Sequence, residues 1–378
     1  ANVNADGIIR FNGTSTVLDA SGTISNSINI YVNNGDTLLL GSNVFGSTYT
    51  ANFTLENGAT LGVGHPSGLL SSGASGNLQV TGTRSYGKGA NYIYNGTAAQ
   101  VTGSGLPDSV NDFSVNNTSG DVSLSQSLNI GGTLGLLSGR LNPLSYNLKI
   151  TSAGSIGTVN TGSYVNGKLI RHVAAAPGTL GYPIGTSTGY TPVSIDFSSV
   201  TSPGAVSVVS NDNASSNYPS SSLRYWTITT ESGLGAFSAT PTFEFLSGDL
   251  SVGATAANLR AYKFDAPSTY AYPTGVNTAN SFSASNITSF SEFGAGECPD
   301  ISVTVDNVSA LCTGSPDKYS LTWSAEASTA GFVNVYFLDS TLNPGVIYIP
   351  VPGGLTAGSY KAKLGSVSYT HLTLPTKA

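Results

Sequence analysis

The 378-residue sequence is most unusual for how little charge it carries. Aspartate, glutamate, lysine and arginine make up 9% of the chain, against about 25% in an ordinary soluble domain. The net charge is −6, and no run of basic residues is present that could neutralise phosphates. No apolar run approaches the ~20 residues of a membrane-spanning helix. These absences argue against a nucleic-acid partner and against a membrane-spanning segment.

Methionine is absent, and cysteine occurs only at Cys298 and Cys312. This composition is unusual for an intracellular enzyme and favours an exported protein, although no signal peptide is visible. We therefore expect the N-terminus to be a processed or fragment end. In an exported chain the two cysteines favour a disulfide, which would close a loop of about 15 residues and contribute about 3 kcal/mol. Zinc is disfavoured because no histidine lies nearby.

The sequence is rich in the residues that build β-structure and its turns. It holds 46 glycines, 19 tyrosines and 14 phenylalanines, and 39% of its residues are hydrophobic. Disorder is not expected, because disordered chains combine low hydrophobicity with high net charge. The pattern of short apolar alternations between Gly, Asn and Asp predicts an all-β protein.

Internal repeats are the strongest signal in the first half of the chain. Residues 30–41 align with residues 53–64 at an offset of 23, and residues 92–97 align with residues 113–118 at an offset of 21. Further apolar residues recur at offsets of 20 or 21: Val101 and Val122, Phe113 and Leu134, Val115 and Leu136, Leu128 and Leu148, Ile130 and Ile150.

A period of 20–23 residues with two or three short strands predicts a right-handed parallel β-helix over residues 1–173. Such strands cannot bury a face alone, and stacking one turn on the next supplies a continuous core. About seven turns would give a rod some 30–35 Å long. The alternative is an array of β-sandwiches, which favours turns every 8–12 residues without this recurrence.

Residues 174–297 lose the short repeat and gain longer strands, which predicts an antiparallel β-sandwich. A strand over residues 164–173 is expected to lead into it, and its expected aromatic core is Tyr225, Trp226, Phe243 and Phe245. The strands are expected at residues 190–197, 205–210, 223–230, 240–246, 258–264 and 287–294.

Residues 298–366 alternate like the strands of a truncated immunoglobulin-like domain, at residues 301–305, 319–323, 333–338 and 346–351. The last twelve residues, Val367–Ala378 (VSYTHLTLPTKA), resemble the conceptual translation of a sequencing adapter. We therefore exclude residues 367–378 from the fold.

Three runs carry a resemblance to a known class of protein: NYIYNGTAAQVTGSGLP, LGYPIGTSTGYTPVSI and ITSFSEFGAGE. They resemble the large secreted, adhesin-like repeat proteins of Bacteroidota and related bacteria. Such proteins usually end in a sorting domain for type IX secretion. The resemblance implies an extracellular or cell-surface location. Its motifs are structural, so no catalytic or binding residue carries over.

Candidate catalytic groups are few. Glycoside hydrolysis needs two carboxylates roughly 5–10 Å apart, and the one close pair in the repeat region is Asp108 and Asp112, which a turn explains as well. A polysaccharide lyase would need a basic residue near acidic ones, but Arg84 and Lys88 have no such acids nearby in the sequence.

The remaining polar candidates are better explained as turns or surface residues. His65 lies in the Gly/Pro loop GVGHPSG, and His172 lies in the expected strand KLIRHV. Neither accompanies a nucleophile motif. Residues 211–213 (Asn-Asp-Asn) could offer oxygens to Ca²⁺, but three adjacent residues fall short of the six to eight ligands required. No catalytic, cofactor or metal residue is therefore assigned.

The sequence favours a non-catalytic structural and adhesive segment of a secreted or cell-surface protein, acting as a rigid stalk that is monomeric as a fragment. The candidate partner is a surface polysaccharide or another extracellular polymer. The alternatives are a carbohydrate-binding or polysaccharide-cleaving β-helix module, because an exposed tyrosine could stack on a sugar, and a passive repeat without a ligand.

Overall fold

The fold is described from a computed structural model. It describes residues 2–3, 7–16, 27–46, 50–160, 162–175, 178–217, 224–250, 259–266, 268–272, 280–297, 320–325, 331–338, 344–351 and 358–363. The chain divides into two compact units, Ala1–Ala295 and Gly296–Ala378. Each unit is described by itself.

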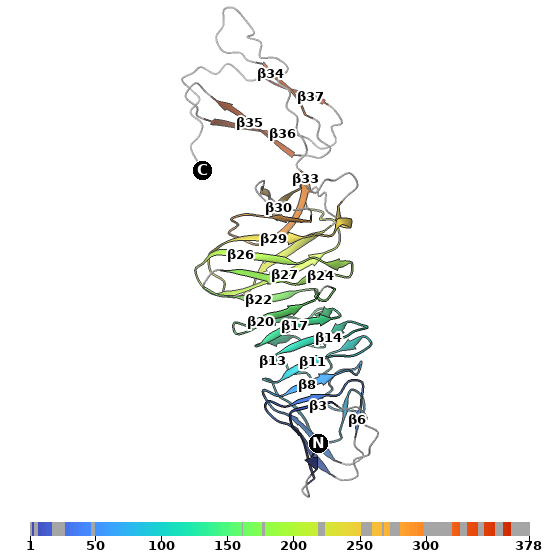
Figure 1. Cartoon of the computed structure of the whole chain (residues 1–378). Helices are drawn as coiled ribbons and strands as arrows, with labels where there is room; N and C mark the ends of the chain where they lie inside the picture. The colour runs from blue at the N-terminus through green and yellow to red at the C-terminus, as the bar shows by residue number, and fades with distance from the viewer. Residues whose placement is uncertain are drawn as a thin grey trace, which may run out of the picture. The chain divides into compact units, whose positions relative to one another are not determined.

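The first unit begins with a parallel β-solenoid of about seven turns, whose strands climb in chain order from blue to green in Figure 1. The β7 sheet holds β1 (Asn2–Val3), β2 (Ile8–Phe11), β4 (Ile28–Val32), β7 (Ala51–Leu55) and β10 (Arg84–Tyr86). The β11 sheet holds β3 (Thr14–Thr16), β5 (Thr37–Leu39), β8 (Thr60–Val63), β11 (Asn91–Tyr94), β14 (Phe113–Asn116), β17 (Thr133–Ser138) and β20 (Ser155–Val159).

Two further sheets complete the solenoid, together with the short pair β6 (Phe45–Gly46) and β9 (Leu78–Gln79). The β15 sheet holds β12 (Gln100–Val101), β15 (Val122–Ser123), β18 (Leu141–Asn142), β21 (Val165–Asn166), β24 (Ile184–Thr186) and β25 (Gly189–Tyr190). The β16 sheet begins with β13 (Ser109–Val110), β16 (Leu128–Ile130), β19 (Leu148–Ile150) and β22 (Leu169–Val173).

The strand registers confirm most of the predicted repeats. Tyr92 lies opposite Phe113, and Tyr94 lies opposite Val115. The pairs Ile30 with Phe53, Phe113 with Leu134 and Leu128 with Leu148 are also formed. These side chains are almost fully buried, because every second residue of each strand points into the coil. The apolar alternation of the sequence therefore builds one continuous stacked core.

The predicted pairing of Val101 with Val122 is wrong by one residue. Val122 lies opposite Gln100, and Val101 lies opposite Ser123. Gln100 is 2% exposed and Val101 is 42% exposed. A one-residue change of register exchanges the two faces of a strand. Here the inward position holds a polar side chain, and its hydrogen bonds are the physical reason for this register.

One turn of the solenoid is longer than the sequence period predicts. Phe53 pairs with Arg84, and Thr60 pairs with Asn91, so this turn spans 31 residues. Its extra residues form a loop after β8 that lies against β12 and the segment that follows it. There the backbone N–H of Val101 donates to the Pro66 oxygen at 2.9 Å. The β7 sheet ends at β10, next to this insertion.

The predicted single strand over residues 164–173 is interrupted at Gly167, which has a φ of +142°. The chain forms β21 and β22 instead, in two different sheets. β22 then pairs in antiparallel fashion with β27. The parallel sheet of the solenoid thus continues, without a break in pairing, into the antiparallel strands that follow.

The region after the solenoid is built from antiparallel strands of two sheets. The β16 sheet continues through β27 (Gly204–Asn211), β28 (Tyr225–Thr230), β33 (Glu292–Glu297), β30 (Leu259–Asp265) and β31 (Ser268–Tyr272). A four-stranded sheet holds β23 (Thr179–Tyr182), β26 (Val193–Val200), β29 (Phe237–Glu244) and β32 (Ser281–Ser283). A short 3₁₀ helix, η1, covers Ser247–Asp249.

Aromatic rings fill the core of this region, as the sequence predicts. The Trp226 ring lies 5.2 Å from the Phe243 ring, and Phe243 stacks on Phe282 at 5.1 Å. Phe245 is also buried. Tyr225 was predicted to join this core but is only partly buried, because its neighbour Trp226 takes the inward position of β28.

In the part of the second unit that the structure describes, the strands form two antiparallel pairs. β34 (Ser320–Ala325) pairs with β37 (Gly358–Lys363), and β35 (Gly331–Leu338) pairs with β36 (Pro344–Val351). Three of the four strands predicted for this region overlap these elements. Cys298, Cys312, the strand predicted at residues 301–305 and the adapter-like residues 367–378 lie outside the described residues.

Candidate functional site

The acidic side chains of the solenoid bond the backbone of a neighbouring turn. Asp36 Oδ1 accepts from the Gly13 N–H at 2.6 Å, and Asp112 Oδ1 accepts from the Thr133 N–H at 2.6 Å. Glu56 Oε2 accepts from the Asn34 N–H at 3.1 Å. Hydrogen bonds to a charged acceptor are the stronger class. These carboxylates hold successive turns together at their corners.

Asp108 and Asp112, the predicted carboxylate pair, bond to different turns of the solenoid, one to the preceding turn and the other to the following turn. Asp108 Oδ1 lies 2.6 Å from Lys88 Nζ in the preceding turn, whereas Asp112 caps Thr133 in the following turn. The hydrogen bond from Lys88 lowers the pKa of the Asp108 carboxyl. Stacking therefore brings Lys88 next to an acid 20 positions away in the sequence, which the residue spacing did not reveal.

Three buried amide side chains fasten one corner of the solenoid. Asn77 accepts from the Gly64 and His65 N–H groups and donates to the Gly41 and Asn43 oxygens. Gln100 and Asn117 form the next part of this cluster, joined by a 2.9 Å bond from Asn117 Nδ2 to Gln100 Oε1. Because buried polar groups are costly when unpaired, the cluster fixes which backbone atoms meet at this corner.

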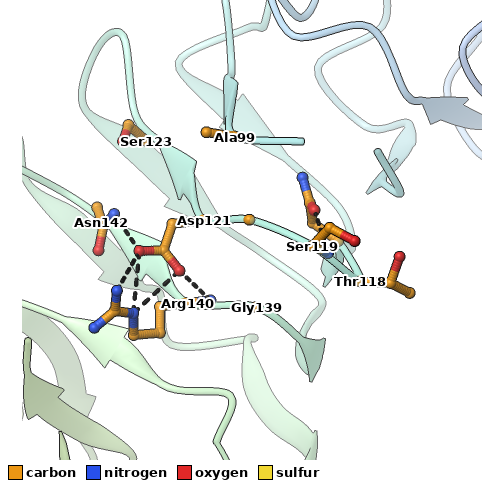
Figure 2. A pocket seen from close by; sticks show the side chains of 10 residues that line it. Ala99, Thr118, Ser119, Asp121, Ser123, Gly139, Arg140 and Asn142 are labelled. Carbon is orange, nitrogen blue, oxygen red and sulfur yellow. Dashed lines mark hydrogen bonds and ion pairs between the residues drawn. The ribbon is translucent and has the colours of Figure 1, made fainter. Parts of the chain in front are cut away.

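A depression of about 600 Å³ lies on the β15 sheet and the corner leading into it (Figure 2). It crosses three successive turns of the solenoid. Ala99, Asp121 and Arg140 occupy equivalent positions in these turns, because each directly precedes the inward residue of β12, β15 or β18. The lining residues are Ala99, Asn117, Thr118, Ser119, Gly120, Asp121, Ser123, Gly139, Arg140 and Asn142. Seven of these ten residues have polar side chains, and none is aromatic.

Asp121 and Arg140 form the centre of this depression. Arg140 Nη2 lies 2.7 Å from Asp121 Oδ2, and its Nε lies 3.1 Å from Oδ1 and 3.0 Å from Oδ2. The same carboxylate accepts from the Arg140 backbone N–H and from Asn142 Nδ2. A carboxylate has about four acceptor positions, so Asp121 is saturated by its own protein. The hydroxyls of Thr118, Ser119 and Ser123 remain as groups that could meet a ligand.

The Asp121 carboxyl makes stability depend on pH in the acid range. Partial burial raises its pKa, but hydrogen bonds from Arg140 and Asn142 outweigh this and hold the pKa below its ordinary value. Its contribution is therefore fully present above about pH 4 and is lost as the pH falls through the lower folded pKa. We expect the difference in urea midpoint between the wild type and Asp121→Asn to be constant near neutrality and to shrink in acid. A difference that persists in strong acid would contradict this assignment.

The two predicted histidines do not join a cluster of reactive groups in the described structure. His65 Nδ1 accepts from the Ser67 N–H at 3.1 Å, which closes the loop locally. His172 lies half-buried on β22. Among the described residues no group of three or more His, Cys, Asp or Glu side chains could hold a metal ion. Asn213 donates only to the adjacent Ala214 oxygen, as expected for a turn.

Arg84 was weighed as a basic group but clamps the inserted loop. Its guanidinium donates to the Leu70 oxygen at 3.2 Å, the Gly73 oxygen at 2.5 Å and the Val80 oxygen at 2.9 Å. Desolvation lowers its pKa. Tyr86 Oη donates to the same Leu70 oxygen at 3.1 Å. The 31-residue turn is thus held by side chains of the strand that follows it.

A buried charged network, which the sequence did not reveal, lies beyond the solenoid. The Arg224 side chain is 0% exposed and binds Asp249 through two hydrogen bonds, of 2.7 and 3.1 Å. Its remaining donors reach the hydroxyls of Thr186, Thr188 and Ser210. These partners lie 14–38 residues away in sequence. A lone Arg in a weakly charged chain is the only sequence signal that could have indicated it.

The comparisons with known proteins add no relative. No helix of the described residues is long and apolar enough to cross a membrane. No family model matches the chain, and no curated protein and no solved structure matches it.

Proposed function

We propose that the chain is a non-catalytic structural and adhesive segment of a secreted or cell-surface bacterial protein. The observation that carries this proposal is the use of the solenoid's carboxylates. Asp36, Glu56, Asp108, Asp112 and Asp121 each bond a backbone N–H or a basic side chain of a neighbouring turn. An acid that catalyses must reach a substrate atom. Asp36, Glu56, Asp112 and Asp121 instead hold neighbouring turns together, and Asp108 is paired with Lys88 at the surface.

The proposed architecture is a right-handed parallel β-helix stalk that presents two β-domains. The antiparallel strands over residues 179–297, with an aromatic core between them, support a β-sandwich. The antiparallel pairs β34–β37 and β35–β36 support an immunoglobulin-like domain. Low charge, the absence of methionine and the resemblance to secreted adhesin-like repeat proteins support export, with type IX secretion as the route.

The proposal predicts that the protein does not cleave polysaccharides. The intact chain is incubated with pectin, alginate, xylan and β-glucan, and released reducing ends and unsaturated uronates are measured. We expect no release above a heat-denatured control. We also expect a fragment that contains the solenoid to survive proteinase K, because the described strands are paired from one turn to the next. Release that disappears in Asp108→Asn or Asp112→Asn would overturn the proposal.

A second candidate function, carbohydrate binding, is favoured by one exposed turn. The Pro143 oxygen accepts from the Tyr146 N–H at 3.0 Å, and the Tyr146 side chain is 37% exposed. Leu144 beside it is 66% exposed and adopts a φ of +57°, which is uncommon for a leucine. The turn follows β18, which also contributes Asn142 to the polar depression.

Tyr146→Ala is expected to weaken binding of a neutral oligosaccharide about two- to tenfold, the loss of one stacking contact. Calorimetric titration with cellohexaose and laminarihexaose measures the effect. Tyr31→Ala, on the β7 sheet, is the matched control and should leave the affinity unchanged. Equal affinities for wild type and Tyr146→Ala would exclude the turn as a binding site. The absence of any binding would favour a passive repeat.

A further inference from the structure

A row of outward-facing positions runs along the solenoid on the β15 sheet. Each member lies next to a residue that is at most 2% exposed, and opposite the next member in the neighbouring strand. Residues that lie opposite each other in paired strands point to the same face of a sheet. The strands from β12 to β25 therefore present one continuous line of positions on the outside. This line, called the outer row, consists of Val101, Ser123, Asn142, Asn166, Gly185 and Tyr190.

The outer row has an apolar group at each end and polar groups between them. Val101 is 42% exposed at the first end. At the other end Tyr190 is half-buried, and its ring lies 5.6 Å from the Tyr164 ring. The Tyr164 ring covers Gly185, since a Cβ built on that glycine would lie 2.7 Å from Tyr164 Cε2. An aromatic pair thus closes this end, and the polar depression of Figure 2 lies between it and Val101.

The middle of the row offers hydrogen-bonding groups without net charge. Asp121 and Arg140 are the charged residues of the depression, and their side chains are 26% and 29% exposed and paired at 2.7 Å. Thr118 and Ser119 are exposed beside them, and Ser123 is half-buried in the row itself. A hydroxyl group can both donate and accept a hydrogen bond. The depression is therefore suited to a ligand that carries many hydroxyl groups.

A neutral sugar fits this surface better than a protein or a polyanion does. The cores of protein interfaces are rich in aromatic residues and poor in serine, whereas the depression has two serines and no aromatic side chain. A polyanion would meet a chain of net charge −6, and Arg140 is already neutralised by Asp121. A pyranose ring has hydroxyls at its rim and apolar C–H groups on its faces, which match the polar middle and the apolar ends.

We propose that the outer row binds an extended chain of neutral sugars that lies along the solenoid axis. The six strands of the row are separated by five steps, which span about 24 Å at about 4.8 Å each. One pyranose unit of an extended chain is about as long as one such step. Hydroxyls of the central units bond to Ser123 and Asn142, and a terminal ring stacks on Tyr190. The inference rests on the adhesive part of the proposed function and names its ligand and its surface.

Calorimetric titration of the intact chain with cellohexaose, xylohexaose and mannohexaose tests the outer row. Ser123→Phe places a large ring over the depression and is expected to weaken the tightest of the three complexes at least about tenfold. Ser114→Phe is the matched control, because Ser114 is half-buried on β14 of the same turn but belongs to the β11 sheet. It should keep the wild-type affinity. Melting curves show that both variants are folded.

A second variant and an acidic ligand complete the test. Tyr190→Ala should weaken binding about two- to tenfold, the loss of one stacking contact, and it decides the question if Ser123→Phe fails to fold. A hexamer of galacturonate should bind at least about fivefold more weakly than the best neutral hexaose, and equal or tighter binding would contradict the neutral class of ligand.

Three results would overturn the outer row as the binding site. They are an unchanged affinity in folded Ser123→Phe, an affinity lowered by Tyr146→Ala alone, and a wild type that binds none of the three neutral hexaoses. Each of them leaves the non-catalytic role of the chain standing, because only cleavage of a polysaccharide would contradict that role. The failure of this inference is therefore distinguishable from the failure of the proposed function.

Discussion

Replacing Asp249 with alanine is expected to lower the free energy of unfolding by about 3–5 kcal/mol, because it leaves the Arg224 guanidinium buried without its counter-charge. Asp249 supplies both carboxylate oxygens to Arg224, and its Oδ2 also accepts from the Leu246 N–H at 2.8 Å. The hydroxyls around Arg224 are neutral and cannot replace the charge. Urea unfolding followed by Trp226 fluorescence measures the loss. The Trp323→Phe background leaves Trp226 as the one tryptophan.

Two further variants separate lost charge compensation from lost packing. Replacing both partners, as in Arg224→Met with Asp249→Leu, should restore part of the stability, since an apolar pair of similar volume is often neutral. Lys88→Ala removes the exposed pair with Asp108 and serves as the control, with an expected change close to zero. A loss at Asp249→Ala no larger than at Lys88→Ala would show that the buried network contributes nothing.

Replacing Gln100 with leucine is expected to lower the free energy of unfolding by about 3 kcal/mol, although it makes the core more apolar. The Gln100 amide accepts from the Gly96 N–H and donates to the Val63 and His65 oxygens, each at 2.8–3.1 Å. Leucine would leave these backbone groups buried without partners, at about 1–3 kcal/mol each. The gain from burying the leucine side chain offsets part of this loss.

Gln79→Leu provides the matched control for this change. Gln79 lies half-buried on β9, and its side chain donates to the Gly76 oxygen at 3.1 Å. Because one turn carbonyl loses a partner, we expect a change below about 1 kcal/mol. An unchanged or higher free energy of unfolding for Gln100→Leu would contradict this account, because it would show that the hydrogen bonds of Gln100 do not determine the register of β12.

The repeated part of the fold could be predicted because its signal is local. Tyr92 and Phe113 recur at a fixed spacing, and each is followed two residues later by another inward side chain. Recurrence at this spacing, with apolar residues at every second position, defines both the strands and their neighbours. The positions of Asp108, which is exposed, and of Asp112, which is half-buried, at the corner around β13 also follow from local sequence.

The polar interior could not be predicted, since its partners are set by the stack. The sequence paired Val101 with Val122 because both are apolar. In the structure Gln100 takes the inward position, because its side chain bonds four polar groups, one from its own turn and three from the two neighbouring turns. The 31-residue turn was missed because its extra loop carries no repeat of its own. Arg224 and Asp249 lie 25 residues apart in regions without a period. Such contacts depend on tertiary placement, which residue spacing alone does not reveal.

The central claim is that the carboxylates of the solenoid hold its turns together, and Asp112 tests it most directly. The measurement is the free energy of unfolding of Asp112→Ala, with the exposed Asp212→Ala as its control. We predict a loss of about 1.5–3 kcal/mol for Asp112→Ala, the strength of a hydrogen bond from the Thr133 N–H to a charged acceptor, and almost none for Asp212→Ala. An Asp112→Ala protein as stable as the wild type would contradict the claim and return this carboxylate to the candidates for chemistry.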